Sequence, residues 1–378
     1  MSGLYLHIPF CKQACSYCDF YFVTRTEQKK NFVDALINEI KYYAGTPYAE
    51  ETVKTIYIGG GTPSLLSPKE LSAIFDAIND TFQLELQEVT LEMNPDDVTK
   101  EYLSSLHDLG VDRASMGVQS FNPELLSFMN RAHNREEALR CLELLSQSGF
   151  QTFTVDLIYG NPGQSLEQLQ DDVETLLKFD PPHISAYSLT VEPRTRLGKQ
   201  VELGRIEPPK DDEVADHFDL INQLFLEQGI HRYEVSNYSK SGHKAIHNSN
   251  YWQHENYLGL GPGAHSFWWD GKAMRWSNKK DLRAYLDGST KTMTDQEALG
   301  NIELAEERIM MGLRTHKGIV IDEFEQRYDY QFQDDQLEYL NDKQKEEKVE
   351  MDSTVRLTNK GIKIADAIIL DLITLHKH

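Results

Sequence analysis

The stretch LYLHIPFCKQACSYC, residues 4–18, runs from a short apolar segment directly into three closely spaced cysteines, Cys11, Cys15 and Cys18. A cluster of four irons is usually held by four thiolates, so a C-x₃-C-x₂-C loop holds three irons and leaves the fourth open to a small molecule. The remaining cysteine, Cys141, lies far away in the sequence. The stretch therefore predicts an iron–sulfur cluster with one open iron, placed where a buried strand ends.

Three plainer interpretations of these cysteines compete with a cluster. A structural zinc site pairs two short Cys/His hairpins, and no second hairpin lies where it would complete the set. A disulfide framework is typical of small secreted chains rich in cysteine, whereas this chain has 4 cysteines in 378 residues. Free cysteines at the exit of a buried strand stay open as an interpretation, but they would not need this spacing.

Composition sets the class of protein. The formal net charge is 38 − 60 = −22, which argues against nucleic acid as a partner because a phosphate backbone requires a concentrated basic surface. The first residues lack the basic and apolar regions of a signal peptide, and no run of 18 apolar residues occurs. We expect a reducing cytoplasm, where a cluster and free thiols survive, with peripheral association at the inner face of the membrane left open.

Apolar strand-like runs alternate with amphipathic helical patterns over the first half of the chain. The predicted strands are Leu4–Pro9, Thr55–Ile58, Val89–Met93, Arg113–Val118, Thr152–Tyr159 and Ile184–Thr190. The predicted helices are Lys29–Tyr43, Pro68–Ile78, Lys100–Leu109, Arg135–Gln147 and Leu166–Lys178. Six strands separated by helices predict an α/β fold with a parallel sheet, and the pattern alone leaves both a barrel and an open sheet possible.

Polar residues of unusual type follow the ends of successive predicted strands. They are Cys11, the Gly59–Ser64 turn, Glu92, Gln119 and Asp156. Because the carboxyl ends of parallel strands meet on one face, we expect these residues to share one pocket. The glycines of the turn can expose backbone amides to a charged ligand, or simply form a tight turn; no nucleotide-binding glycine fingerprint is present.

The two acids in apolar strands, Glu92 and Asp156, need a partner because an unpaired buried carboxylate is costly. A cation or a ligand beside them is one explanation. A structural ion pair between Asp156 and Arg131 is another, and the sequence does not decide between them.

The second half of the chain is less regular. A helix is expected at Glu213–Gln228 and a strand at Arg232–Ser236, whereas residues 239–276 show little periodicity and read as a functional surface segment rather than a core element.

Helices are then predicted at Asn301–Leu313, Ile321–Tyr328, Asp335–Glu346 and Asn359–Leu372, with a β-ribbon at Val349–Leu357. We predict three parts: a core at 1–238, a His- and aromatic-rich segment and linker at 239–294, and a small, mainly helical, winged-helix-like domain at 295–378. Because the C-terminal domain is acidic, we expect it to dock a partner or to cover a site as a lid rather than to bind DNA.

The motifs together resemble a known superfamily. C-x₃-C-x₂-C with Tyr17 before the third cysteine, followed by GGGTP at residues 59–63, is similar to the radical S-adenosylmethionine (SAM) superfamily. YLHIPFC at 5–11, GVQSF at 117–121 and DLIYG at 156–160 resemble its oxygen-independent coproporphyrinogen III oxidase-like branch. The resemblance covers most of the chain and implies a partial (β/α)₆ barrel.

The resemblance implies a set of cofactors and their ligands. Cys11, Cys15 and Cys18 would bind a [4Fe–4S] cluster, whose open iron would chelate SAM, and an electron donor would reduce the cluster. The positions that match the superfamily's SAM contacts are Tyr5, Gly60, Gly61, Thr62, Glu92, Gln119, Arg131 and Asp156. A sulfonium, an ammonium, a carboxylate and ribose hydroxyls call for this mixture of acids, amides and one arginine.

Two departures from the oxidases point to a different group of the same branch. Oxidases carry a further cysteine two residues after the third, where this chain has Phe20, and they carry a long N-terminal extension, whereas ten residues precede Cys11 here. HNSNYW at 247–252 matches the H-N-x-x-Y-W segment of the HemW group of haem chaperones.

That resemblance implies a haem site in the second half of the chain. His247 would be the haem ligand, with His243, His254 and His265 as competitors, since imidazole is a common axial ligand of haem iron. The aromatic residues that would cover the macrocycle are Tyr251, Trp252, Tyr257, Phe267 and Trp268. A plainer role for His247 is a hydrogen-bonded histidine within an aromatic loop.

The resemblance implies a haem chaperone that binds haem and delivers it to acceptor haemoproteins, at the membrane or elsewhere, using the cluster and SAM. Whether SAM is cleaved in that role stays open. The alternative function is oxidative decarboxylation of coproporphyrinogen III to protoporphyrinogen IX by a radical enzyme.

Overall fold

The computed structural model describes residues 2–288, 290 and 293–375. Six neighbouring strands run parallel and in chain order, which confirms the predicted parallel sheet. These strands are β1 (Ser2–Ile8), β2 (Val53–Gly60), β3 (Leu84–Met93), β4 (Arg113–Gln119), β5 (Thr152–Tyr159) and β6 (His183–Ser188). β1 continues to β9 and β6 to β8 rather than to each other, so the barrel is partial and open.

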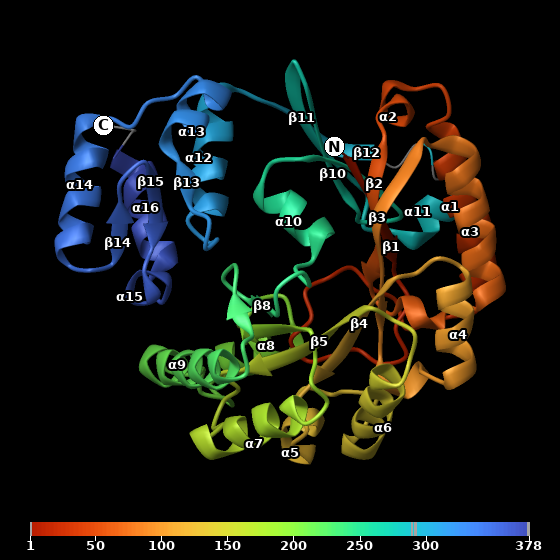
Figure 1. The fold of residues 1–378 in the computed structure, drawn as a ribbon. Coiled ribbons are helices and arrows are strands. Elements are labelled where there is room, and N and C mark those ends of the chain that lie inside the picture. Colours follow the sequence, from red (N-terminus) through yellow and green to blue (C-terminus); the bar gives the residue numbers. More distant parts are fainter. Residues whose placement is uncertain (1, 289, 291–292, 376–378) are drawn as a thin grey trace.

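Helices cover the outer face of these strands (Figure 1). The five predicted crossover helices are confirmed as α1 (Lys29–Tyr42), α3 (Pro68–Thr81), α4 (Lys100–Asp108), α6 (Arg135–Ser146) and α7 (Leu166–Leu177). Capping boxes at Ser67, Asn134 and Ser165 start α3, α6 and α7, because each cap bonds the backbone amide three residues on. The sequence did not predict the short helices α2 (Pro47–Glu50), α5 (Pro123–Phe128) and α8 (Arg196–Glu202), nor the 3₁₀ turns Pro63–Leu65 and Pro95–Asp97.

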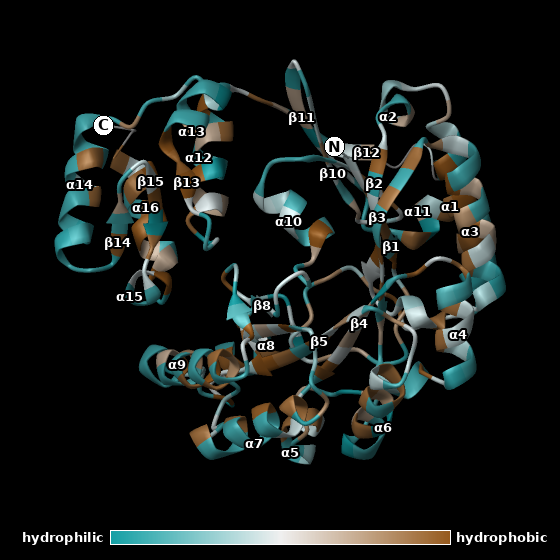
Figure 2. Cartoon of the chain, viewed as in Figure 1, coloured by the Kyte–Doolittle hydropathy of each residue, from teal (hydrophilic) through white to brown (hydrophobic). Residues whose placement is uncertain are grey.

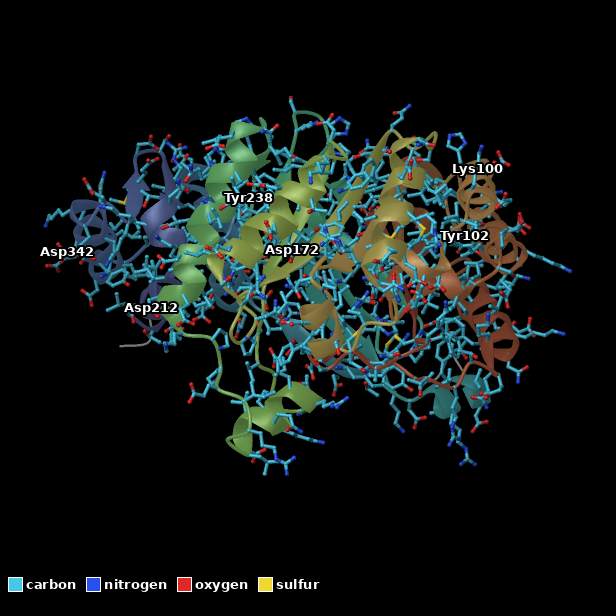
Figure 3. The ribbon with its side chains drawn as sticks, turned by 90° about the horizontal axis from the view of Figure 1, so that it is seen from below. Lys100, Tyr102, Asp172, Asp212, Tyr238 and Asp342 are labelled. Atoms are coloured by element: carbon cyan, nitrogen blue, oxygen red, sulfur yellow. The ribbon has the colours of Figure 1, made fainter. Side chains whose placement is uncertain are left out.

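The apolar core lies between the sheet and these helices, and includes Leu6, Ile8, Ile56 and Leu91, each fully buried. The outward faces of α9 (Asp211–Glu227) and α14 (Asp334–Lys345) are hydrophilic (Figure 2). Seen from below, Asp172 on α7 lies near the middle of the molecule, with Lys100 and Tyr102 of α4 at one end and Asp342 of α14 at the other (Figure 3).

Residues 239–276 were predicted to lack core elements, and this prediction is wrong. They contain α10 (Ile246–Trp252), β9 (Asn256–Leu260), β10 (His265–Asp270) and most of β11 (Lys272–Asn278). β9 pairs in parallel with β1, and Leu258, Leu260 and Phe267 are buried. The polar and glycine residues between these positions hide the strand period, so burial beside β1 rather than local sequence determines the segment.

The antiparallel edges of the sheet were also missed in part. The strand predicted at Arg232–Ser236 is instead a hairpin of β7 (His231–Arg232) and β8 (Asn237–Ser239). At the other end β12 (Met293–Leu299) pairs with β11, after α11 (Leu282–Gly288).

The C-terminal part has the predicted winged-helix order. It comprises α12 (Asn301–Gly312), β13 (Ile319–Val320), α13 (Ile321–Tyr328), α14, β14 (Val349–Met351), β15 (Thr354–Leu357), α15 (Asn359–Ile362) and α16 (Ala365–Leu375). A small sheet in the order β13-β15-β14 packs with these helices. The predicted final helix is two helices, since α15 ends at Ile362. Within the described ranges no helix is long and apolar enough to cross a membrane.

Candidate functional site

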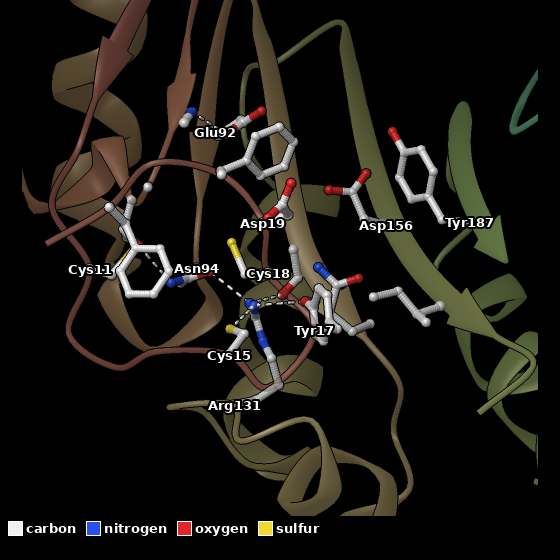
Figure 4. A pocket seen from close by; sticks show the side chains of 18 of the residues that line it. Cys11, Cys15, Tyr17, Cys18, Asp19, Glu92, Asn94, Arg131, Asp156 and Tyr187 are labelled. Carbon is white, nitrogen blue, oxygen red and sulfur yellow. Dashed lines mark hydrogen bonds between the residues drawn. The ribbon is translucent and has the colours of Figure 1, made fainter. Parts of the chain in front are cut away.

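A cavity of about 470 Å³ opens at the carboxyl ends of β1 to β6 (Figure 4). All three loop cysteines line it, together with seven of the residues predicted from the sequence. Those seven are Gly60, Gly61, Thr62, Glu92, Gln119, Arg131 and Asp156. The expectation that successive strand ends share one pocket is therefore confirmed by the geometry, and we call this space the loop cavity.

The cysteine loop, residues 11–18, is shaped by backbone hydrogen bonds. The Cys11 amide donates to the Val23 carbonyl at 3.0 Å, and the Ser16 amide donates to the Met129 carbonyl at 3.0 Å. The Leu197 amide donates to the Ser16 carbonyl at 2.8 Å. Because these bonds do not involve the thiols, the loop keeps its path without a metal.

The three thiols are half-buried around the rim of the loop cavity. Burial raises the pKa of the Cys11 thiol to about 12 and that of Cys18 to about 11, so both are protonated before a metal binds and would release protons on binding. Among the described residues, no three Cys, His, Asp or Glu side chains lie close enough to hold a single metal ion. This spacing fits a cluster, in which each thiolate binds a different iron, better than it fits zinc.

Arg131 connects the cysteine loop to two strand ends. Its Nη2 donates to Asn94 Oδ1 and to the Gly117 carbonyl, both at 2.8 Å, and its Nη1 donates to Cys15 Sγ at 3.2 Å and Tyr17 Oη at 3.3 Å. These four bonds take the place of the ion pair with Asp156 that the sequence left open. The guanidinium Nε is buried and has no hydrogen-bond partner among the described residues, so a ligand would satisfy it.

The glycines after β2 are required by the close approach of β1. Gly60 has φ +109°, and a Cβ there would lie 2.6 Å from the His7 ring. A Cβ on Gly61 would lie 2.6 Å from the Phe10 carbonyl oxygen. The glycines therefore form a tight turn and also bring the backbone to the cavity. The same turn places Thr62 at the cavity, where Thr62 Oγ1 accepts a hydrogen bond from Asn94 Nδ2 at 3.1 Å.

The two strand acids line the loop cavity, and no basic side chain in the described part of the chain forms a hydrogen bond with either of them. Glu92 accepts from Tyr57 Oη at 2.6 Å and from the Gly60 amide at 3.0 Å, and burial raises its pKa. Burial raises the pKa of Asp156 to about 7, and the negative charge of Glu92 adds to the effect. Two buried acids that repel each other favour a cationic ligand between them.

Gln119 supplies a further open acceptor. It has φ +72° at the end of β4, and its buried Oε1 has no hydrogen-bond partner within the described ranges. Backbone strain of this kind concentrates at functional sites. The acids, the free acceptor and Arg131 Nε together fit a ligand that carries both charges, as the amine, carboxylate and sulfonium of SAM do.

Two of the predicted site residues lie outside the loop cavity. Tyr5 lines a second, larger cavity beside the loop cavity, and its Oη forms a hydrogen bond with His7 Nδ1 at 3.1 Å. His247, on α10, is 1% exposed. Its Nδ1 bonds Thr55 Oγ1 at 2.8 Å, its Nε2 bonds Tyr251 Oη at 2.7 Å, and its ring stacks on Tyr57.

Four residues that line or support the loop cavity were not predicted from the sequence: Tyr57, Asn94, Asp19 and Tyr187. Asn94 follows the end of β3 directly, before a proline, and this position past a strand end was a usable signal. Tyr57 lies inside a strand, where only the three-dimensional pairing shows that its hydroxyl meets Glu92.

Comparison with known proteins agrees with the geometry. The radical SAM superfamily pattern matches residues 5–176, and the HemN C-terminal domain matches residues 299–364. The chain is 36% identical over 335 residues to the heme chaperone HemW of Lactococcus lactis (88% of this chain, 86% of that protein) and 35% identical over 336 residues to that of Bacillus subtilis (87% of each). The HemW of Escherichia coli is 37% identical over 295 residues (76% of each chain). The solved coproporphyrinogen III oxidase HemN of Escherichia coli has a TM-score of 0.82 at 22% identity, covering 99% of this chain and 90% of that one, which shows the same fold.

Proposed function

The chain belongs to the HemW family of the radical SAM superfamily, and from this membership we propose that it is a haem chaperone, which binds haem and delivers it to acceptor haemoproteins. The observation that carries the proposal is the similarity to several proteins named heme chaperone HemW along most of the chain. The likeness to the oxidase HemN concerns the fold alone.

Phe20 is the local feature that favours a chaperone over an oxidase. It stands where the oxidases of this branch carry a cysteine, two residues after Cys18. Its side chain is 69% exposed and lines both the loop cavity and the second cavity. A large apolar side chain exposed there suits contact with a macrocycle better than metal ligation.

In this proposal the loop cavity holds the cluster and SAM. Cys11, Cys15 and Cys18 bind the [4Fe–4S] cluster, which when reduced supplies an electron for cleavage of SAM. Glu92 and Asp156 offset the positive charges of SAM, while Arg131 Nε and Gln119 Oε1 bond its polar groups. The Gly60–Thr62 turn lets the backbone approach the ligand closely, and the ring of Tyr5 lies 6.1 Å from that of Tyr57, which bonds Glu92.

His247 is proposed to support haem binding, as the H-N-x-x-Y-W motif implies. Direct ligation of iron through one ring nitrogen requires that nitrogen to leave its partner, Thr55 or Tyr251, which costs a buried hydrogen bond, roughly 1–3 kcal/mol. His247→Ala is expected to weaken haem binding and to leave the absorbance of the cluster unchanged. Equal haem affinity of variant and parent would contradict a role for this residue.

The proposed partners are haem, the haem-accepting proteins and an electron donor for the cluster. We place the protein in the cytoplasm, at the inner face of the membrane when it meets a membrane-bound acceptor. Co-sedimentation of the haem-loaded protein with vesicles that contain such an acceptor, and not with empty vesicles, is the expected result.

One experiment separates the chaperone from the oxidase. The protein with reconstituted cluster is incubated with dithionite, SAM and coproporphyrinogen III, and in parallel is titrated with haem. The proposal predicts saturable haem uptake at one haem per chain and no protoporphyrinogen. Protoporphyrinogen formed over several turnovers would establish the oxidase instead.

A further inference from the structure

The second cavity, with a volume of about 790 Å³, lies between the sheet and the C-terminal helix α12. Its walls come from β1, β9, β10 and β11 on one side and from α10 and α12 on the others. Small-molecule and cofactor sites commonly have about 300–1,000 Å³. We call this space the helix-side chamber, and it adjoins the loop cavity through four shared residues, Asp19, Phe20, Glu92 and Tyr187.

Three histidines line the helix-side chamber, and two of them are already engaged. His7 bonds Tyr5 Oη at 3.1 Å and the Tyr21 carbonyl at 2.8 Å. His254 bonds Tyr328 Oη and Glu307 Oε2, both at 3.1 Å, and stacks on Phe267. Each would have to lose a buried hydrogen bond before it could bind iron.

His265 is the third histidine of the chamber, and its ring is free. It stands at the first position of β10, its side chain is exposed, and within the described part of the chain neither ring nitrogen has a hydrogen-bond partner. Partial burial and the positive charges of Lys280 and Arg275 lower the pKa of His265. The imidazole is therefore neutral at pH 7, which is the form that binds metals.

Lys280 provides a positive charge beside this histidine. It lines the chamber and is exposed, and its stem packs against Gly263. Arg275, by contrast, is held by Glu307 at 2.5 Å and by Glu297 at 3.3 Å. Among the described residues Lys280 forms no ion pair with a chamber carboxylate, so its charge is available to an anionic group of a ligand.

The rest of the chamber is largely aromatic and thioether surface. Phe20 and Tyr257 lie on the sheet side, and Met310 and Met311 on α12. Met310 and Phe20 are exposed, at 37% and 69%. Thioether and aromatic side chains adapt to a flat, polarizable ring.

We infer that the helix-side chamber is the haem site of this protein, with His265 as an axial ligand of the iron and Lys280 as the partner of a propionate. This inference rests on the proposed haem-chaperone function and gives it a location. His247 then acts as a positioning residue, since it bonds the hydroxyl of Tyr251, which lines the same chamber.

Haem titration with His265→Ala tests the ligand. Compared with the parent, the variant should bind haem at least tenfold more weakly and lose the absorption and resonance Raman features of histidine-ligated iron. Added imidazole should restore those features, which a merely structural role would not allow. His265→Gln guards against misfolding, and His231→Ala, an exposed histidine on β7 at the far end of the sheet, is the matched control.

Lys280 is tested with two forms of the ligand. Lys280→Ala should weaken binding of haem severalfold and leave binding of haem dimethyl ester, which lacks the carboxylates, unchanged. Lys280→Arg should bind haem like the parent.

The two levels of the hypothesis fail in different ways. A parent protein that shows no saturable haem binding would overturn the proposed function itself. A parent that binds haem while His265→Ala and His265→Gln keep its affinity and spectrum would overturn this inference alone, and loss of the spectrum in His247→Ala that added imidazole restores would identify His247 as the ligand instead.

Discussion

Replacing Cys15 with serine should abolish the cluster and leave the fold intact. The thiol of Cys15 makes one contact that the substitution affects, the bond from Arg131 Nη1 at 3.2 Å. Arg131 keeps its bonds to Asn94 and Gly117 in the variant. The neighbouring Ser16 amide and carbonyl hold the loop through bonds to Met129 and Leu197 that do not depend on the thiol.

The magnitude follows from that single contact. A hydrogen bond to a charged group contributes roughly 1.5–3 kcal/mol, and the serine hydroxyl replaces part of it. We therefore expect the free energy of unfolding of the metal-free protein to fall by about 1 kcal/mol, which for a chain of this length shifts the melting temperature by roughly 1–2 °C. Iron binding, in contrast, loses one of three thiolates and with it the cluster.

The assay compares two readouts on the same preparations. Iron and sulfide content after reconstitution reports the cluster, and circular dichroism melts of the metal-free proteins report stability. Cys141→Ala is the matched control, because Cys141 is 1% exposed in α6, with its Sγ 3.4 Å from Met116 Sδ. It should lose roughly 1 kcal/mol or more through the cavity it creates and keep a full cluster.

Two results would refute this reasoning. A Cys15→Ser protein that is unfolded without metal would show that the thiol shapes the loop. A Cys15→Ser protein that retains the iron content of the parent would show that Cys15 is not a ligand.

Three further predictions concern buried charged groups, two in the loop cavity and one between α1 and α11. Burial raises the pKa of Asp156 to about 7, and a bound cation favours its charged form. The affinity for SAM, measured by calorimetric titration, should therefore fall as the pH drops from 8 to 6, by up to roughly tenfold per pH unit. An Asp156→Asn protein with the same pH dependence would contradict this assignment. Arg131→Met should weaken SAM binding and slow cluster assembly, measured as iron uptake, whereas an unchanged rate would remove Arg131 from the site. Tyr285→Phe removes a donor 2.6 Å from the buried Glu39 and should lower the free energy of unfolding by about 1–3 kcal/mol in urea denaturation; no change would mean that Gly261 and Asn278 satisfy the carboxylate alone.

The first half of the chain was predictable because local and global signals agree there. Apolar strands end in polar residues, and cap residues such as Ser67 and Asn134 mark where helices begin. The convergence of Cys11, Glu92 and Asp156 followed from the topology of parallel strands alone.

The second half was not predictable in the same way. β9 is a strand because it pairs with β1, more than two hundred residues away in the chain, and its glycine and tyrosine hide the period. The state of each histidine also depends on its partners: Thr55, far away in the chain, and Tyr251 engage His247, whereas His265 has no hydrogen bond to any described residue. A single sequence shows four similar histidines and not which of them faces a cavity.

Direct haem transfer is the measurement that tests the central claim most directly. The haem-loaded protein is mixed with increasing concentrations of an apo-haemoprotein whose haem spectrum differs from its own, and the rate of the spectral change is recorded. A chaperone that hands haem over in a complex predicts a transfer rate that rises with acceptor concentration. A rate that is independent of acceptor concentration, set only by release of haem into solution, would contradict the account.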